Sequence, residues 1–191
     1  MLSHDFTLLV CPATIDISGE DALIRVAQPD DAAAIARIHV RSWQQAYADL
    51  LPADYLHSLD STVGQREAWW RQSIEEAKEP VFVASIDGMI VGWVSPGASR
   101  DDVESQRTGE IRAIYVLAEY WGTGMGRALW SAAIKYLAQQ RYERVTLWVL
   151  VGNHRAIAFY TRAGLEPEIG SKRSIVRGGQ SLEEIRYQLA L

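Results

Sequence analysis

One segment of the chain, residues 108–165, constrains the fold more than any other. A strand-like run at 111–116 leads into a loop with three glycines, Gly122, Gly124 and Gly126, and the loop opens directly into a helix. A helix N-terminus presents unpaired backbone amides and the positive end of the helix dipole, and glycines allow a ligand to approach the backbone. This order of elements favours an anionic, phosphate-bearing ligand, although the glycines alone are also compatible with a tight strand-to-helix turn.

The glycine loop matches neither of the two commonest phosphate-binding patterns. No Gly-Lys-Ser/Thr sequence follows it, as a Walker loop would require, and Arg127 stands where the dinucleotide fingerprint has its third glycine. A protein that holds a nucleotide in this loop is therefore the least favoured of the ligand-binding interpretations.

Composition excludes several classes of protein. The 191 residues suit one domain, and the hydrophobic content of 48% and charged content of 23% are those of a globular protein. The net charge of −5 argues against nucleic-acid binding. A single cysteine, Cys11, excludes an intrachain disulfide or a cysteine metal cluster, and the four histidines lack close ligand spacing, so we expect no metal. The longest apolar run, 145–151, is too short for a membrane span, and residues 1–21 do not resemble a signal peptide, so a cytoplasmic location is expected.

Periodicity and turn residues predict the order of the elements. Residues 1–21 form an extension with one possible strand at 6–11, and residues 22–191 form a single domain. A first helix begins near Pro29 and ends at 50–52, and the polar stretches 96–106 and 172–179 are expected to be connections. Further helices are expected at 52–59, 64–77, 125–140 and 153–163. Strands are expected at 22–27, 80–86, 89–94, 110–116, 144–151, 165–170 and 181–189. Asp87-Gly88 predicts a hairpin turn, and the order as a whole predicts an α+β fold with a mixed sheet.

Two motifs in this order resemble the GNAT superfamily of N-acetyltransferases. The glycine motif of that family, Gln/Arg-x-x-Gly-x-Gly/Ala, corresponds to residues 121–126. Its downstream motif, Asn-x-x-Ala-x-x-x-Tyr-x-x-x-Gly-Phe, corresponds to residues 153–165, and the resemblance extends over about 22–191. Trp121 departs from the usual Gln/Arg, and Leu165 departs from Phe.

The resemblance implies a fold and an activity. The fold would be a mixed, mostly antiparallel sheet of six to seven strands flanked by about four helices. The activity would be transfer of an acetyl group from acetyl-CoA to a primary amine of a small molecule, peptide or protein, directly in a ternary complex and without a metal. A non-catalytic acyl-CoA-binding sensor or scaffold on the same fold is the alternative.

The resemblance also assigns residues to the donor, acetyl-CoA. The strand before the loop would pair with the pantetheine arm, the loop amides would hold the pyrophosphate, and the second motif would line the arm. The implied residues are Ile114, Tyr115, Val116, Trp121, Gly122, Thr123, Gly124, Met125, Gly126, Arg127, Asn153, Ala156 and Phe159.

Catalysis would need an acid for the leaving thiolate and a base for the amine. By resemblance, Tyr160 is the acid, with a packed core tyrosine as the alternative. Glu110 matches the glutamate that acts as base in the histone-acetyltransferase branch, with a solvated strand-edge carboxylate as the alternative. Trp43 and Tyr47 are the candidate walls of the acceptor pocket, whereas His39 on the same helix is expected to be structural.

The sequence leaves the acceptor open among polyamines, aminoglycosides, amino acids and protein N-termini. Trp69 and Trp70 are adjacent and cannot share one helix face, so one of them is expected to be exposed or at an interface. A homodimer is a further possibility, and no membrane partner is expected.

Overall fold

A computed structural model describes residues 22–101 and 107–191. The possible strand at 6–11 lies outside these residues.

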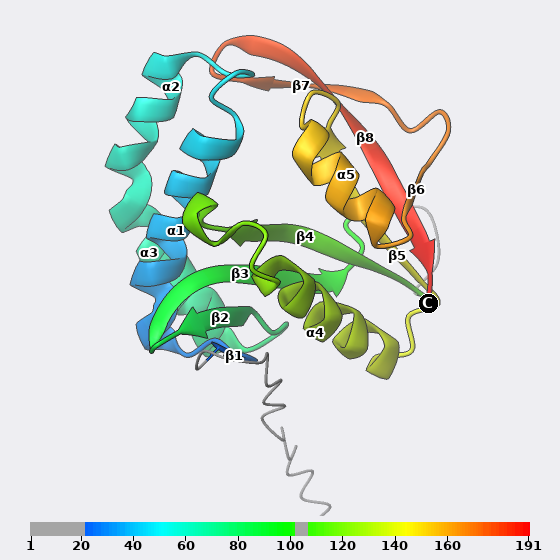
Figure 1. The fold of residues 1–191 in the computed structure, drawn as a ribbon, viewed down its shortest axis with the longest axis horizontal. Coiled ribbons are helices and arrows are strands. Elements are labelled where there is room, and N and C mark those ends of the chain that lie inside the picture. The colour runs from blue at the N-terminus through cyan, green and yellow to red at the C-terminus, as the bar shows by residue number, and fades with distance from the viewer. Residues whose placement is uncertain (1–21, 102–106) are drawn as a thin grey trace, which may run out of the picture.

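Eight strands form one mixed sheet in the described part of the chain (Figure 1). Every neighbouring pair is antiparallel except β4 and β5, which run parallel. The sheet order is β1 (Ala22–Val26), β2 (Phe82–Ile86), β3 (Met89–Ala98), β4 (Thr108–Val116), β5 (Arg144–Leu150), β8 (Gln180–Ala190) and β6 (Glu166–Pro167), and β7 (Arg173–Arg177) also pairs with β8. The predicted mixed, mostly antiparallel sheet is confirmed, with one strand more than the six to seven expected.

The helices lie on both sides of this sheet. Figure 1 shows α1, α2 and α3 grouped on one side and α4 and α5 on the other. Their bounds are α1 (Ala32–Ala46), α2 (Ala53–Ser58), α3 (Val63–Glu76), α4 (Met125–Gln139) and α5 (His154–Arg162), with short 3₁₀ turns at η1 (Pro29–Asp31), η2 (Leu59–Thr62) and η3 (Ala118–Tyr120). Within the described ranges, no helix has the length and apolar content that crossing a bilayer requires.

The C-terminal region differs from the prediction. The basic segment 172–179, expected to be a connection, contains strand β7, which forms a hairpin with β8. Gly178 and Gly179 both have positive φ, as a two-residue hairpin turn requires, so the Gly-Gly pair was the local signal for this hairpin. The strand expected at 165–170 is reduced to Glu166–Pro167.

The region after β3 is a second correction. Residues 96–98 were expected to begin a loop, but they continue β3 and pair with β4. The register shifts between Ser95 and Pro96, and a bulge is one of the few places where a sheet accepts proline. The Asp87-Gly88 hairpin is confirmed, since both residues have positive φ.

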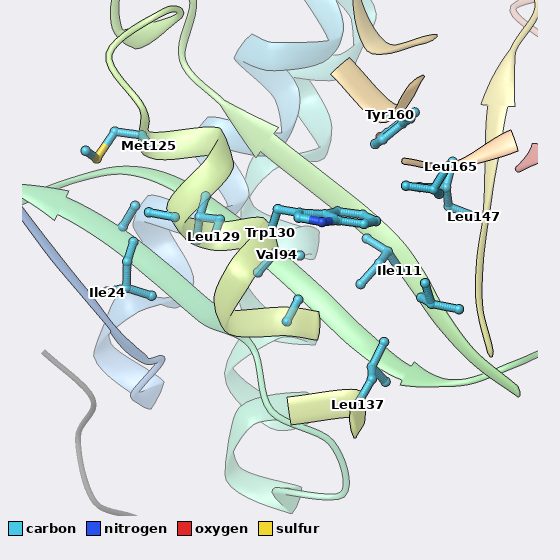
Figure 2. Packing of buried hydrophobic residues seen from close by; sticks show 14 of the residues in the cluster. Ile24, Val94, Ile111, Met125, Leu129, Trp130, Leu137, Leu147, Tyr160 and Leu165 are labelled. Atoms are coloured by element: carbon cyan, nitrogen blue, oxygen red, sulfur yellow. The ribbon is translucent and has the colours of Figure 1, made fainter. Parts of the chain in front are cut away.

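One hydrophobic core lies between the sheet and α4 and α5. Leu129 and Leu137 of α4 are fully buried against residues such as Val94 and Ile111, and Figure 2 shows these side chains together. Tyr160 of α5 closes the same core. This packing fixes where α4 begins, which places the glycine loop at the end of β4.

A second core lies between the sheet and α1 and α3. Ile35 of α1 and Trp93 of β3 are both fully buried there. His39 of α1 packs between Trp93 and Tyr115 of β4, with ring centroids 5.5 and 5.3 Å away. Burial lowers the pKa of His39 to about 3, and the nearby Arg66 guanidinium adds to this shift. His39 is therefore neutral in the folded protein at neutral pH.

The depressed pKa of His39 predicts a loss of stability on mild acidification. The pKa of His39 is about 3 in the folded protein and 6.5 in the unfolded chain. At pH values between these two, the unfolded chain binds a proton that the folded protein does not bind. Stability therefore falls as the pH drops below 6.5, by about 2 kcal/mol between pH 7 and 5 from this group alone. Urea unfolding of the wild type and of His39→Gln at pH 7 and at pH 5 would measure this change in the free energy of unfolding.

The variant is expected to lose this part of the pH dependence. His57→Gln, on the exposed surface of α2, serves as the control and should keep it. An unchanged difference between pH 7 and 5 in His39→Gln would contradict the prediction.

Candidate functional site

The sheet divides between β4 and β5. Their parallel ladder ends at Glu110 and Thr146, although β4 continues to Val116 and β5 to Leu150. Just beyond this point β4 has a bulge at Arg112, since Ala113 pairs with Ser95 and Ile111 pairs with Pro96. A bulge bends its strand and increases the local twist. The bend turns β4 away from β5 and opens the sheet at its centre.

The division leaves one edge of β4 available. In the described sheet, no strand pairs with residues 111–116 on the side that faces β5. An exposed strand edge carries backbone N–H and C=O groups that an extended, amide-containing ligand can pair with. Ile114, Tyr115 and Val116 all lie on this segment.

The glycine loop follows at the end of that edge. Gly122 and Gly124 have φ of 82° and 94°, a conformation that favours glycine, and a Cβ at either would meet no atom within 4 Å. Gly124 is the N-cap of α4, so the amides of the first helical turn, from Met125 to Arg127, are free of intrahelical partners. The residues fit an anion at this loop because the loop is open and the first-turn amides have no intrahelical partner.

Trp121 has a structural role that the family motif does not suggest. Its indole N–H donates to the carbonyl of Val116 at 2.8 Å, which ties the glycine loop to the end of β4. The Arg155 guanidinium lies over the indole, 3.8 Å from the ring centroid. This contact brings an exposed cation of α5 to the residue that precedes Gly122.

The second motif forms helix α5 as predicted. Asn153 is the N-cap, and its side chain accepts a hydrogen bond from the amide of Ala156 at 3.1 Å. Phe159 packs close to Gly126, where an added Cβ would lie 3.6 Å from its ring. Both helix N-termini, of α4 and α5, are therefore fixed beside the opening of the sheet. Thr123 is occupied within the loop, because its hydroxyl donates to the carbonyl of Tyr120.

Side chains from three elements gather at the inner end of this opening. Trp43 of α1 donates to the Tyr115 hydroxyl at 2.8 Å and makes an edge contact with Tyr47. Burial raises the pKa of Tyr47, while hydrogen bonds with Asn153 and Tyr115 oppose the shift. Burial, followed by the neighbouring Tyr47, raises the pKa of Tyr160 far above its ordinary value. Tyr160 is therefore a protonated phenol at every pH at which the protein would work.

Glu110 lies apart from these aromatic residues, at the last position of β4 that pairs with β5. It is 2% exposed, so the alternative of a solvated strand-edge carboxylate is wrong. Arg100 holds both of its oxygens: the Arg100 amide donates to Oε2 at 3.0 Å and the guanidinium to Oε1 at 2.5 Å. The carboxylate is thus fixed in orientation within the sheet.

The structure adds residues to the site that sequence reasoning missed. These residues are Arg100, Arg155 and Glu184 of β8. Glu184 is included because its charge influences the pKa of both Tyr47 and Arg100. Arg155 lies inside the second motif, whereas no local pattern marks Arg100 or Glu184.

A pocket of about 700 Å³ lies on the α1 and α3 face of the sheet. It borders the bulge, since Arg112 and Ala113 line it. His39 and Trp93 form part of the wall; His39 stacks on Tyr115, and Trp93 makes an edge contact with it. Trp69, 59% exposed, also lines the pocket next to the buried Trp70, which confirms that only one of this adjacent pair is exposed.

Comparison with known proteins agrees with this geometry. A model of the acetyltransferase (GNAT) family matches residues 32–165. The uncharacterized N-acetyltransferase YuaI of Bacillus subtilis (strain 168) is 32% identical over 163 residues, which cover 85% of this chain and 89% of that protein.

Two solved structures share the fold. The paia N-acetyltransferase of Thermoplasma acidophilum, in complex with coenzyme A, has a TM-score of 0.70 and 17% identity over 89% of this chain and 99% of that one. The yncA structure from Salmonella typhimurium, with its cofactor acetyl-CoA, has a TM-score of 0.67 and 23% identity over 89% and 94%. The family model, the relative and the shared fold lead to one assignment: the chain belongs to the GNAT family of acetyltransferases and is an acyltransferase.

Proposed function

We propose that this protein transfers an acetyl group from acetyl-CoA to the primary amine of an acceptor, directly and with both substrates bound. The observation that carries the proposal is the open edge of β4, which leads into a glycine loop at the start of α4. The same opening holds a buried, protonated tyrosine. All eight described strands belong to one sheet, which also supports treating residues 22–191 as one domain.

The donor would lie along β4 and end at the loop. The backbone at Ile114 to Val116 would pair with the amides of the pantetheine arm, as an added strand does. The amides from Gly122 to Arg127 would hold the pyrophosphate, helped by the α4 dipole. Asn153, Ala156 and Phe159 would border the arm from α5. Bound there, acetyl-CoA supplies an activated acyl group, and the chain supplies its position.

Two proton transfers would accompany acetyl transfer. As the amine nitrogen forms a bond to the acetyl carbon and the C–S bond breaks, the sulfur gains electrons and the nitrogen must lose a proton. Tyr160 would donate its proton to the sulfur. Glu110 would accept the amine proton through water, since its carboxylate is fixed by Arg100 on the same face as the pocket.

The acceptor would approach from the α1 and α3 side. Trp43 and Tyr47 are held by hydrogen bonds to Tyr115 and Asn153, which makes them rigid walls. The pocket beside the bulge opens on this side of the sheet, opposite α4 and α5.

Release of free thiol from acetyl-CoA, measured with a panel of amines, tests the proposal. We expect turnover with at least one primary amine, and a drop in kcat of about 100-fold in Tyr160→Phe because the proton donor is removed. The affinity for CoA should not change. Tyr142→Phe, in the turn between α4 and β5, is the control.

Two results would count against this function. Tight binding of CoA with no turnover of any amine would indicate a sensor instead of an enzyme. Full activity of Tyr160→Phe would remove Tyr160 from the chemistry.

The position of Arg155 predicts a contribution to donor binding. It is an exposed cation held on Trp121 beside the phosphate loop, so Arg155→Ala should raise the Kd of CoA about tenfold. Arg162→Ala, exposed at the other end of α5, should leave it unchanged. Calorimetric titration with CoA at low and moderate salt would measure both, and equal affinities of Arg155→Ala and wild type would contradict the prediction.

A further inference from the structure

The pocket beside the bulge is unusually rich in positive charge for an acidic protein. Four cations and two carboxylates line it, although the net charge of the chain is −5. The cations are Arg66, Lys78, Arg100 and Arg112, and the carboxylates are Glu76 and Glu79. The charge of the pocket is thus opposite to that of the molecule.

Three of the four cations already have carboxylate partners. Lys78 pairs with Glu76 at 3.0 Å, and Arg100 pairs with Glu110. Arg112 donates to Glu79 at 2.9 Å, and that carboxylate also accepts from the amide of Ala98. Both lining carboxylates therefore already have a cationic partner.

Among the four cations that line the pocket, Arg66 is the exception in the described part of the chain. Its Nε donates to the Thr62 hydroxyl at 2.9 Å, and one terminal nitrogen lies 3.3 Å from a ring nitrogen of His39. His39 is neutral, so neither neighbour balances the charge. The half-buried guanidinium stays on the pocket wall without a carboxylate partner in the described part of the chain.

Unpaired donors point to the same chemistry. In the described residues, three buried side-chain polar atoms lack a hydrogen-bond partner, and two of them, Nε1 of Trp93 and Nε of Arg112, belong to residues that line this pocket. Buried donors without acceptors are uncommon in folded proteins. The wall of the pocket therefore contains two donors that no acceptor in the described residues satisfies.

The remaining walls are aromatic. Trp69, Trp70 and Trp93 line the pocket. Trp70 makes an edge contact with Trp69 and another with Trp93. A volume of about 700 Å³ is in the range of small-molecule sites. Such walls suit an apolar or aromatic side chain on a molecule that also carries the anionic group.

We infer that the acceptor is a small amine that also carries a carboxylate, as an amino acid with an apolar or aromatic side chain does, and that Arg66 binds the carboxylate. The inference rests on the proposed acetyl transfer and narrows its substrate class. It disfavours polyamines and aminoglycosides, which would meet four cations and no unpaired lining carboxylate.

Three acceptors with the same phenethylamine skeleton test the inference: L-phenylalanine carries a carboxylate, L-phenylalaninamide carries a neutral amide, and phenethylamine carries neither. Spermidine serves as a polycationic acceptor. We expect the highest kcat/KM for phenylalanine, even though the amide has the more easily deprotonated amine. Arg66→Gln should lower kcat/KM for phenylalanine about 10- to 100-fold, mainly through KM, and change phenethylamine little. Arg66→Lys should recover part of the loss.

Arg71→Gln is the matched control, because Arg71 lies on the same helix and pairs with Asp30 outside the pocket. A preference for phenethylamine or spermidine over phenylalanine, or an equal loss for all acceptors in Arg66→Gln, would overturn the inference and leave acetyl transfer standing. No acetylation of any acceptor by protein that binds acetyl-CoA would overturn the proposed function and this inference together.

Discussion

The bulge of β4 at Arg112 is the feature on which the rest of the site depends. A parallel pair in the centre of a sheet normally continues to the end of its shorter strand, but here the ladder stops at Glu110 and Thr146. The bulge lies directly after this point, and residues 111–116 continue along β3 without a partner from β5 in the described sheet. The opening exists because one extra residue bends a central strand.

The two cores hold this opening in place from opposite sides. The core under α4 and α5 fixes the glycine loop and Tyr160. The core under α1 and α3 fixes the wall of the pocket, and His39 packs on Trp93 of this core. The groups proposed to bind the donor and those proposed to bind the acceptor therefore come from opposite faces of one sheet. Tyr115 connects them, because its ring packs on His39 and its hydroxyl accepts from Trp43.

Arginine side chains organise much of the charge around the opening, each with a different partner. Arg100 fixes the buried Glu110, Arg112 is paired with Glu79, and Arg155 lies on Trp121. Arg66 differs from them because its neighbours are a hydroxyl and a neutral imidazole. A charge that the protein leaves unbalanced is the one most available to a ligand.

Local sequence determined the order of helices and strands, the Asp87-Gly88 hairpin, the glycine loop and the motif that begins at Asn153, because each depends on periodicity or on residues a few positions apart. The same signals were sufficient to identify the family. The β7 hairpin was missed because basic residues suggested a connection, although Gly178-Gly179 marked the turn.

Only the tertiary structure decided where β4 leaves β5 and which side chains meet there. Trp43 and Tyr115 are 72 positions apart, Arg112 and Glu79 are 33, and Arg66 and His39 are 27. No periodic pattern encodes such pairs, because they depend on how the helices pack across the twisted sheet. The ion pair of Glu110, the contact of Arg155 with Trp121 and the positive pocket in an acidic chain all arise from that packing.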